Sequence, residues 1–328
     1  MNYNNTPNPI LPGAGVPRSA AGVQACPQGQ YDGTLSNPRG RSGPEKRKGY
    51  EAAKSRKKIL RCKHPIHIST FNARTLKVCE VGDSKGESVL ENNEMCHQMQ
   101  REGIEICGIQ ETRLKHEKDR REMVNSYPSA CGYTMYTVSA WENERNAATG
   151  GLGLILGKTS HELLVGVERV SDRILVAQFR GNPAMTVIVA YAPTEAADDT
   201  TKDDYFGKLC ATLDNVPRHD FLAVLTDANA RLGPDDALHT YNKTTNSNGR
   251  RQLEVMEEYK LLPANTLFKK REGKLWTWRS PQNTLHQIDY VMVRSKWRNS
   301  IINCEAYSSF SSLNSDHRVV TATISLSL

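Results

Sequence analysis

The stretch FLAVLTDANARLG, residues 221–233, joins a short apolar run to a polar end. Five apolar residues and one threonine precede Asp227, and Asn229 follows it after one small residue. Such a run predicts a strand that is covered on both faces of its sheet. Because alternate residues of an extended chain share a face, Asp227 and Asn229 are predicted to point the same way. A buried strand does not need an acid and an amide at its end, so both are candidate functional residues.

Seven other runs rich in β-branched residues also predict strands. They lie at 66–71, 104–110, 150–157, 174–179, 186–192, 287–293 and 319–328. Apolar residues at helical spacing predict helices at 206–216, with Asp203 and Asp204 at its start, at 253–259 and, more weakly, within 87–101. Strands outnumber helices and do not alternate with them, which excludes a Rossmann or barrel arrangement. The pattern predicts an α/β protein in which two mixed or mainly antiparallel sheets pack together with helices outside.

The N-terminal part of the chain has a different composition from the rest. Residues 1–44 contain seven of the 15 prolines and seven of the 23 glycines, without apolar periodicity. Such a segment cannot bury enough apolar surface to offset its chain entropy. We therefore expect residues 1–63 to form a disordered tail, Pro/Gly-rich and then basic, and residues 64–328 to form one large domain.

The net charge of +7 is unevenly distributed between these two parts. Residues 1–63 carry 12 Lys and Arg against three acids, whereas the remaining 265 residues carry 31 against 33. The basic run at 45–63 favours a polyanion or a nuclear import receptor as partner; a solvated tail without a partner is the alternative. Nuclear localisation, alone or shared with the cytoplasm, is the expectation. Within the domain, residues 243–298 hold 12 basic and five acidic side chains and are a candidate phosphate-facing surface.

Cysteine spacing and hydropathy exclude several other classes of protein. No two of the eight cysteines have a CxxC spacing, so neither a zinc site nor a thioredoxin-type pair is indicated. No apolar run approaches the roughly 18 residues of a membrane span, and the N-terminus lacks a signal-peptide core. We expect a soluble intracellular protein in a reducing compartment, neither secreted nor bound to a membrane. The oligomeric state is not readable from the sequence.

Polar residues recur where the predicted strands end. The set comprises Asn72, Glu111, Tyr191, Asp227, Asn229, Asp289, Asp316 and His317. Each has an ordinary structural explanation, such as a turn, a strand exit or a helix cap. Because strand ends gather at one edge of a sheet, we expect the members of the set to converge into one site.

The ordered series FNART, IQETRL, YAP, TDANA, QIDYV and SDHRVV resembles the endonuclease/exonuclease/phosphatase superfamily. The match runs from residue 66 to the C-terminus and implies the DNase I-like four-layer α/β sandwich. Within that superfamily, WTWRSPQNTLHQIDYVMV and the segment ending in SDHRVVTA look like the endonuclease domain of LINE retrotransposons, especially the RTE type. They also resemble host proteins that are named for craniofacial development.

The resemblance and the residue types together imply a chemistry for the site. Cutting a phosphodiester requires a hard cation, an oriented water and groups that accept developing negative charge. Oxygen ligands suit Mg²⁺, with Mn²⁺ as the alternative, and the predicted ligands are Glu111, Asp316 and Asn72. Asp227 and Asn229 would orient the attacking water. Asp289 would hold the imidazole of His317 against the phosphate, as base or as cation, and Tyr191 would offer its hydroxyl to the same phosphate.

Departures from the superfamily pattern keep other functions open. Arg74 stands where DNA-repair members carry a carboxylate, as is common in retroelement endonucleases, and no reverse transcriptase follows Leu328. The expectation is a fragment, a decayed copy or a domesticated gene, with DNA nicking to a 3′-hydroxyl as its activity. The alternatives are an inactive nucleic-acid or chromatin binder and an enzyme acting on abasic DNA. Of Trp276 and Trp278, one is expected in the core; for the other, both the core and a contact with nucleic acid are left open.

Overall fold

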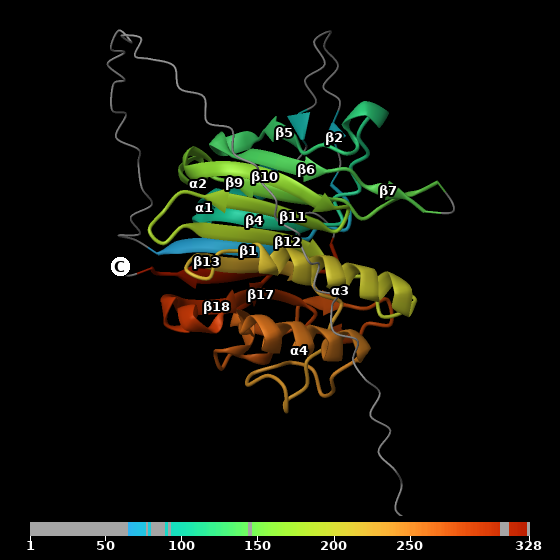
Figure 1. The fold of residues 1–328 in the computed structure, drawn as a ribbon, viewed down its shortest axis with the longest axis vertical. Helices are drawn as coiled ribbons and strands as arrows, with labels where there is room; N and C mark the ends of the chain where they lie inside the picture. The colour runs from blue at the N-terminus through green and yellow to red at the C-terminus, as the bar shows by residue number, and fades with distance from the viewer. Residues whose placement is uncertain are drawn as a thin grey trace, which may run out of the picture. The chain divides into compact units, whose positions relative to one another are not determined.

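The computed structural model describes residues 65–76, 78–79, 89–90, 93–143, 146–308 and 315–326. The predicted tail over 1–63 lies outside these residues. Two large sheets stack face to face in the described part of the chain (Figure 1). The first has seven strands in the order β18 (Ile301–Tyr307), β19 (Val319–Ile324), β1 (Ile66–Asn72), β4 (Ile104–Gln110), β9 (Leu152–Leu156), β6 (Thr134–Val138) and β5 (Asn125–Pro128).

The second large sheet has six strands. Their order is β10 (Leu164–Ser171), β11 (Ile174–Phe179), β12 (Met185–Tyr191), β13 (Phe221–Asp227), β17 (Asp289–Arg294) and β14 (Leu261–Pro263). Each sheet contains one parallel pair, β1 with β4 and β12 with β13, and the other pairs are antiparallel. The predicted mixed sheets are therefore confirmed.

Short elements complete the described part of the chain. Three two-stranded ribbons pair β2 (Val78–Cys79) with β3 (Val89–Leu90), β7 (Trp141–Glu142) with β8 (Ala148–Thr149), and β15 (Trp278–Arg279) with β16 (Leu285–His286). The 3₁₀ helices are η1 (Lys118–Arg120), η2 (Ala130–Gly132), η3 (Ala264–Thr266), η4 (Glu272–Lys274) and η5 (Ser295–Ser300). Ribbon β15–β16 matters for the site, because it brings Trp278 beside His317.

The alternation of side chains along β12 builds two cores at once. Val187 and Val189 face the first sheet and pack in the cluster that includes Ile106 and Leu154. Their neighbour Ile188 belongs to the cluster on the opposite face of the six-stranded sheet. A strand that is apolar at every position is expected where both faces of a sheet are covered.

Helices cover the outer faces of the two sheets. Helix α1 (Asn93–Arg101) packs on the seven-stranded sheet, and α3 (Asp199–Asp214) and α4 (Ser247–Tyr259) pack on the six-stranded one (Figure 1). The short α2 (Lys158–Leu163) follows β9. These layers make the four-layer α/β sandwich that the sequence predicts. No helix in the described ranges is long and apolar enough to cross a membrane.

Helix α3 begins earlier than the sequence predicts. Asp198 is its N-cap, and the carboxylate of this residue accepts a hydrogen bond from the backbone N–H of Thr201 at 2.8 Å. Asp203 and Asp204 therefore lie about one turn inside the helix and do not start it. The prediction failed because the first turn, 199–202, carries no apolar residue that would extend the helical pattern.

Gly108 sets the distance between the two sheets. A Cβ atom at this position of β4 would lie 2.9 Å from Cβ of Leu225 and 3.0 Å from Cγ2 of Val189. Both neighbours belong to the other sheet, so a methyl group here forces the sheets apart or distorts the rotamers of these side chains.

We expect Gly108→Ala to lower the free energy of unfolding by about 1–3 kcal/mol, the usual cost of overpacking a core. Gly207→Ala is the matched control, because Gly207 lies inside α3 with open space around its Cα. It should raise the free energy of unfolding by about 0.5–1 kcal/mol through helix propensity. Denaturant unfolding of both variants checks this, and an unchanged Gly108→Ala protein would contradict the tight packing.

Candidate active site

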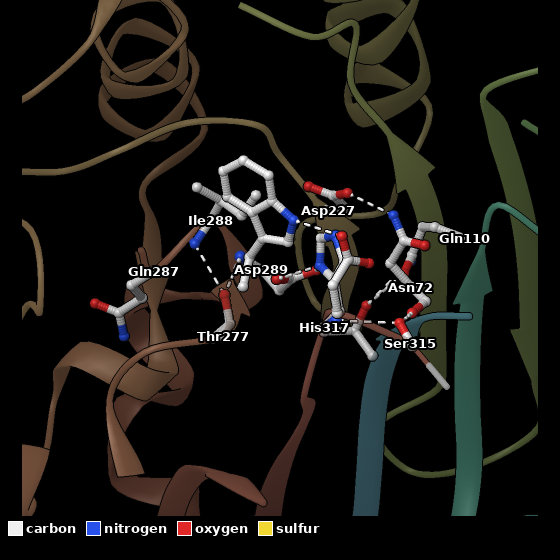
Figure 2. A network of polar contacts seen from close by, with 12 residues as sticks. Asn72, Gln110, Asp227, Thr277, Gln287, Ile288, Asp289, Ser315 and His317 are labelled. Carbon is white, nitrogen blue, oxygen red and sulfur yellow. Dashed lines mark hydrogen bonds and ion pairs between the residues drawn. The ribbon is translucent and has the colours of Figure 1, made fainter. Parts of the chain in front are cut away.

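The ends of four strands bring the predicted site residues together. Parallel β1 and β4 end at the same edge, as do β12 and β13, and Tyr191 pairs in register with Asp227. Strand β17 runs antiparallel to β13 and begins at that edge, so Asp289 stands directly opposite Asp227. Figure 2 shows Asn72, Asp227, Asp289 and His317 gathered at this edge. The predicted convergence is therefore observed for residues from both sheets.

The side-chain amide of Asn72 connects the two sheets. Its nitrogen donates to Oδ2 of Asp227 at 2.9 Å and to Oε1 of Glu111 at 3.2 Å. Its oxygen accepts from the backbone N–H of Arg74 at 2.8 Å. Asn72 is 1% exposed, so these bonds form away from bulk water. The amide nitrogen faces both carboxylates, and the oxygen predicted as a metal ligand already has a partner.

Glu111 receives hydrogen bonds at both carboxylate oxygens. Oε1 accepts from the Tyr191 hydroxyl at 2.7 Å, and Oε2 pairs with the Arg113 guanidinium at 3.0 Å. The backbone of Glu111 has φ 52°, a left-handed conformation that is uncommon outside glycine and often marks functional positions. Burial raises the pKa of the Tyr191 phenol, and the charges of Glu111 and Asp227 raise it further. Tyr191 therefore remains a hydrogen-bond donor.

Asp227 is 1% exposed and faces a second carboxylate. Burial, followed by the charge of Asp289, raises the pKa of Asp227 to about 7, although His317, Asn72 and the backbone N–H of Asn229 oppose the shift. The carboxyl group thus exchanges a proton near neutral pH. This property suits a group that accepts a proton from water.

His317 and Asp289 form a buried pair. Nδ1 of His317 lies 3.0 Å from Oδ2 and 3.2 Å from Oδ1 of Asp289, whose side chain is fully buried. Burial of the imidazole opposes its protonation, but Asp289 outweighs this effect with help from Asp227 and Asp316, and the pKa of His317 rises to about 9. The ring is protonated at neutral pH and is held by Asp289 at Nδ1.

Two hydroxyl groups that the sequence prediction missed hold this pair in place (Figure 2). Thr277 accepts hydrogen bonds from the backbone N–H groups of Ile288 and Asp289 at 3.0 and 3.1 Å. Ser315 donates to the backbone oxygen of Asn72 at 2.7 Å and accepts from the N–H of His317 at 3.1 Å. Ser315 lies within the SDH motif and was within reach of prediction, whereas Thr277 has no local signal in the sequence.

Asp316 lies beside the pair with its own partners. Its Oδ2 accepts from the indole N–H of Trp278 at 3.2 Å, and its Oδ1 lies 4.0 Å from the Arg74 guanidinium. Because Ser315 ties this segment to the end of β1, Asp316 and Glu111 flank the same strand end. The missing carboxylate at position 74 is thus replaced by a cation next to a predicted metal ligand.

The prediction that Asp227 and Asn229 share one face of an extended chain is wrong. Strand β13 ends at Asp227, and Asn229 has φ 46°, so the two residues are not on one extended face. The N–H of Asn229 donates to Oδ1 of Asp227 at 3.1 Å, and its side-chain amide donates to the backbone oxygen of Ala192 at 3.0 Å. Asn229 still lies at the site, as the residue that turns the chain and orients Asp227.

One residue of the tryptophan pair lies in the core, as expected. Trp276 is in the core at 9% exposure, while Trp278 is half-buried and stacks with His286 at 5.5 Å between ring centroids. The rings of Trp278 and His317 lie 6.1 Å apart. Trp278 therefore supports the site through Asp316 and His317.

The donor set fits a hard divalent cation. Glu111 and Asp316 offer carboxylate oxygens, the ligands that Mg²⁺ and Mn²⁺ prefer, and Mg²⁺ usually takes one or two carboxylates. The Arg113 side chain is 39% exposed, so its guanidinium can turn to solvent when a cation approaches Glu111. A second group also qualifies, because one ligand atom from each of Asp227, Asp289 and His317 lies within 4.8 Å of the others. The His317–Asp289 hydrogen bonds favour proton chemistry at that second group.

The fold is the DNase I-like α/β sandwich, shared with solved AP endonucleases and with a retrotransposon endonuclease domain. The AP endonuclease LMAP from Leishmania major has a TM-score of 0.59 and 12% identity, covering 80% of this chain and 88% of that one. The endonuclease domain of TRAS1, a telomere-specific non-LTR retrotransposon, has a TM-score of 0.52 and 13% identity, covering 80% and 100%. Likeness at this level of identity shows the fold.

Among curated proteins, the chain is similar to craniofacial development protein 2. The Bos taurus protein is 27% identical over 322 residues, which is 95% of this chain and 50% of that protein. The chain spans about half the length of the curated relatives it matches. No protein-family model matches the chain.

Replacing Asp289 by Asn should lower the pKa of His317 from about 9 toward the ordinary value of 6.5. Burial lowers this pKa, and the Asp289 carboxylate is the main group that raises it. In the native protein, the raised pKa means that this pair's contribution to stability is fully present below pH 6.5 and is lost as the pH rises through about 9. NMR titration of the imidazole, with chelator present, measures both values. His219, beyond the other end of β13, is the internal reference, and an unchanged His317 pKa would contradict the assigned pairing.

Proposed function

We propose that this protein is a Mg²⁺-dependent DNA endonuclease that nicks one strand by in-line attack of water and leaves a 3′-hydroxyl. The observation that supports it most is the double hydrogen bond from Asn72 to Glu111 and Asp227. The Asn72 amide thus binds both Glu111, a candidate metal ligand, and Asp227, a candidate proton acceptor. Both lie next to the Asp289–His317 pair. A binding surface has no need of that combination.

Asp227 is proposed to take the proton of the attacking water. Its pKa of about 7 lets it accept a proton near neutral pH and release it after the reaction. The hydrogen bonds from Asn72 and from the N–H of Asn229 fix both carboxylate oxygens before substrate arrives. Asp227 is therefore already oriented when water attacks, so no entropy is lost in positioning it at that step.

His317 is proposed to stabilise the negative charge that develops on the phosphate. A protonated ring held at Nδ1 by Asp289 presents its other nitrogen, Nε2, as a donor. The Tyr191 hydroxyl, which donates to Glu111 in the absence of substrate, is the second candidate donor. When bound at Glu111 and Asp316, Mg²⁺ or Mn²⁺ would polarise the phosphate oxygens.

A retrotransposon origin is part of this proposal. The likeness to the TRAS1 endonuclease domain supports it. An inactive nucleic-acid binder is the second candidate, because Arg113 and Arg74 lie next to the two proposed metal ligands and weaken the attraction for a cation. The name of the related craniofacial development protein 2 does not favour either function.

Nicking of supercoiled plasmid tests the proposal directly. Mg²⁺ should produce relaxed circles and a chelator should abolish them. Glu111→Gln and His317→Ala should each slow nicking by about 10²–10⁴-fold, the usual range for loss of acid–base or charge-stabilising groups. The exposed Glu257→Gln and His219→Ala variants are matched controls that should nick at the wild-type rate.

The outcomes of this experiment separate the candidate functions. Wild-type protein that produces no more relaxed circle than His317→Ala is not a nuclease. Duplex binding that survives both site substitutions without any cleavage supports the inactive binder. The same assay on intact and abasic duplexes identifies the third candidate, since an abasic-site enzyme such as LMAP is named for that substrate. Cleavage confined to the abasic duplex would replace the proposed substrate.

The basic segment within residues 1–63 is proposed to direct the protein to the nucleus, by binding an import receptor, DNA or element RNA. Deleting residues 1–60 should move a fluorescently tagged protein from the nucleus to the cytoplasm, because the KRK and RKK clusters are removed. Microscopy of full-length and truncated proteins at matched expression measures this. A nuclear signal that survives the deletion would rule out this role for the segment.

A further inference from the structure

A cavity of about 220 Å³ adjoins the candidate active site. Its lining comprises Trp276, Arg279, Tyr307, Ser308, Ser315, Asp316, His317 and Arg318. It is far larger than the roughly 10–15 Å³ that one water occupies by the same kind of measure. Because Asp316 and His317 form part of its wall, a group bound there would lie directly beside the reacting phosphate.

Arg318 is fixed in this cavity by three contacts. Its guanidinium carbon lies 3.4 Å above the ring of Trp276, and its Nη1 donates to the backbone oxygen of Gly273. Its backbone N–H donates to the oxygen of Thr277 at 2.7 Å. The side chain is thus held in one position before any ligand binds, which reduces the entropy cost of binding.

Arg279 adds a second positive charge to the same wall. Its guanidinium carbon lies 5.5 Å from the Trp276 ring, and its Nη1 donates to the side chain of Asn283 at 2.8 Å. In the part of the chain that the structure describes, no ion pair within 4.0 Å joins a carboxylate to either Arg279 or Arg318. Asp316 faces the cavity, but its carboxylate is already paired with Trp278 and Arg74.

We propose that this cavity is a subsite for a phosphate of the DNA backbone adjacent to the scissile one, bound by Arg279 and Arg318. The proposal rests on the proposed nuclease function, because it assigns the neighbouring position on the same strand. Neither guanidinium forms an ion pair with Asp316, the acid in this wall, so the two guanidinium groups repel each other, and a bound phosphate offsets that repulsion. Guanidinium forks also match phosphate geometry, and the Ser308 hydroxyl lines the same wall.

A base is a poorer fit than a phosphate. Stacking requires an open aromatic face, whereas the Trp276 ring is buried and covered by Arg318. Among the described residues, the remaining lining is polar or charged apart from Tyr307, whose ring is covered by the ammonium of Lys274 at 4.2 Å. Phosphate contacts position a nuclease on its strand without reading sequence. The subsite therefore sets the register of the backbone, not a target sequence.

The test measures binding of a labelled short duplex in chelator, so that no cleavage occurs. Each phosphate contact contributes a slope of about 0.9 to the dependence of log affinity on log salt. Replacing both arginines removes this one phosphate contact, so the advantage of wild type over the Arg279→Gln/Arg318→Gln double variant should shrink about 3.5-fold between 50 and 200 mM salt. Each single substitution should remove part of that effect. Arg298→Gln is the matched control, because Arg298 is exposed in η5 at the far end of β17.

Arg318→Lys guards against a merely structural effect, since it keeps the charge and most of the stem and should retain the salt slope. A neutral methylphosphonate at one position flanking the cleavage point should weaken wild-type binding, weaken binding of each single variant less, and have no further effect on the Arg279→Gln/Arg318→Gln double variant. If Arg279→Gln and Arg318→Gln behave like Arg298→Gln, or if wild type does not bind duplex, the subsite is wrong. A lost salt slope in a protein that never nicks would refute the nuclease and leave the phosphate subsite standing.

Discussion

The amide of Asn72 is the interaction on which the rest of the site depends. It belongs to the last residue of β1 in one sheet and donates to Asp227 at the last residue of β13 in the other. Without this amide, the buried Asp227 and the partly buried Glu111 on the facing sheet would each lose a hydrogen-bond donor, which is costly in a low-dielectric interior. One neutral amide satisfies both without adding charge. The edge of the sandwich can therefore hold several acids close together.

Stacking of the sheets supplies the remaining geometry. Parallel pairing of β1 with β4 and of β12 with β13 delivers Glu111 and Asp227 to one edge, and the antiparallel β17 returns Asp289 to the same place. Gly108 allows the sheets to approach closely in the middle, so that residues at their ends are within hydrogen-bond reach. The chain order of the motifs thus becomes a cluster in space. Burial, and then the charge of the nearby Asp289, raises the pKa of Asp227.

Sequence patterns predicted the central strands and the gathering of polar residues at one sheet edge, because both depend on local order: apolar runs make strands, and polar residues stand where these runs stop. Contacts across the fold were not predictable in this way. The Thr277 hydroxyl accepts a hydrogen bond from the backbone N–H of Asp289, and no motif spacing in the sequence predicts this contact. Asn229 was assigned to an extended face, but a left-handed turn follows Asp227. The edge strand β10 was missed because its residues are partly exposed and interrupted by Gly166.

Glu111 and Asp316 are proposed to bind the same cation at this edge of the sandwich. Anomalous diffraction from crystals grown with Mn²⁺ tests this proposal. We expect one peak bonded to carboxylate oxygens of both residues, at roughly the 2.0–2.2 Å typical of such hard cations. A peak held only by Asp227, Asp289 and His317, or separate ions at Glu111 and Asp316, would contradict it.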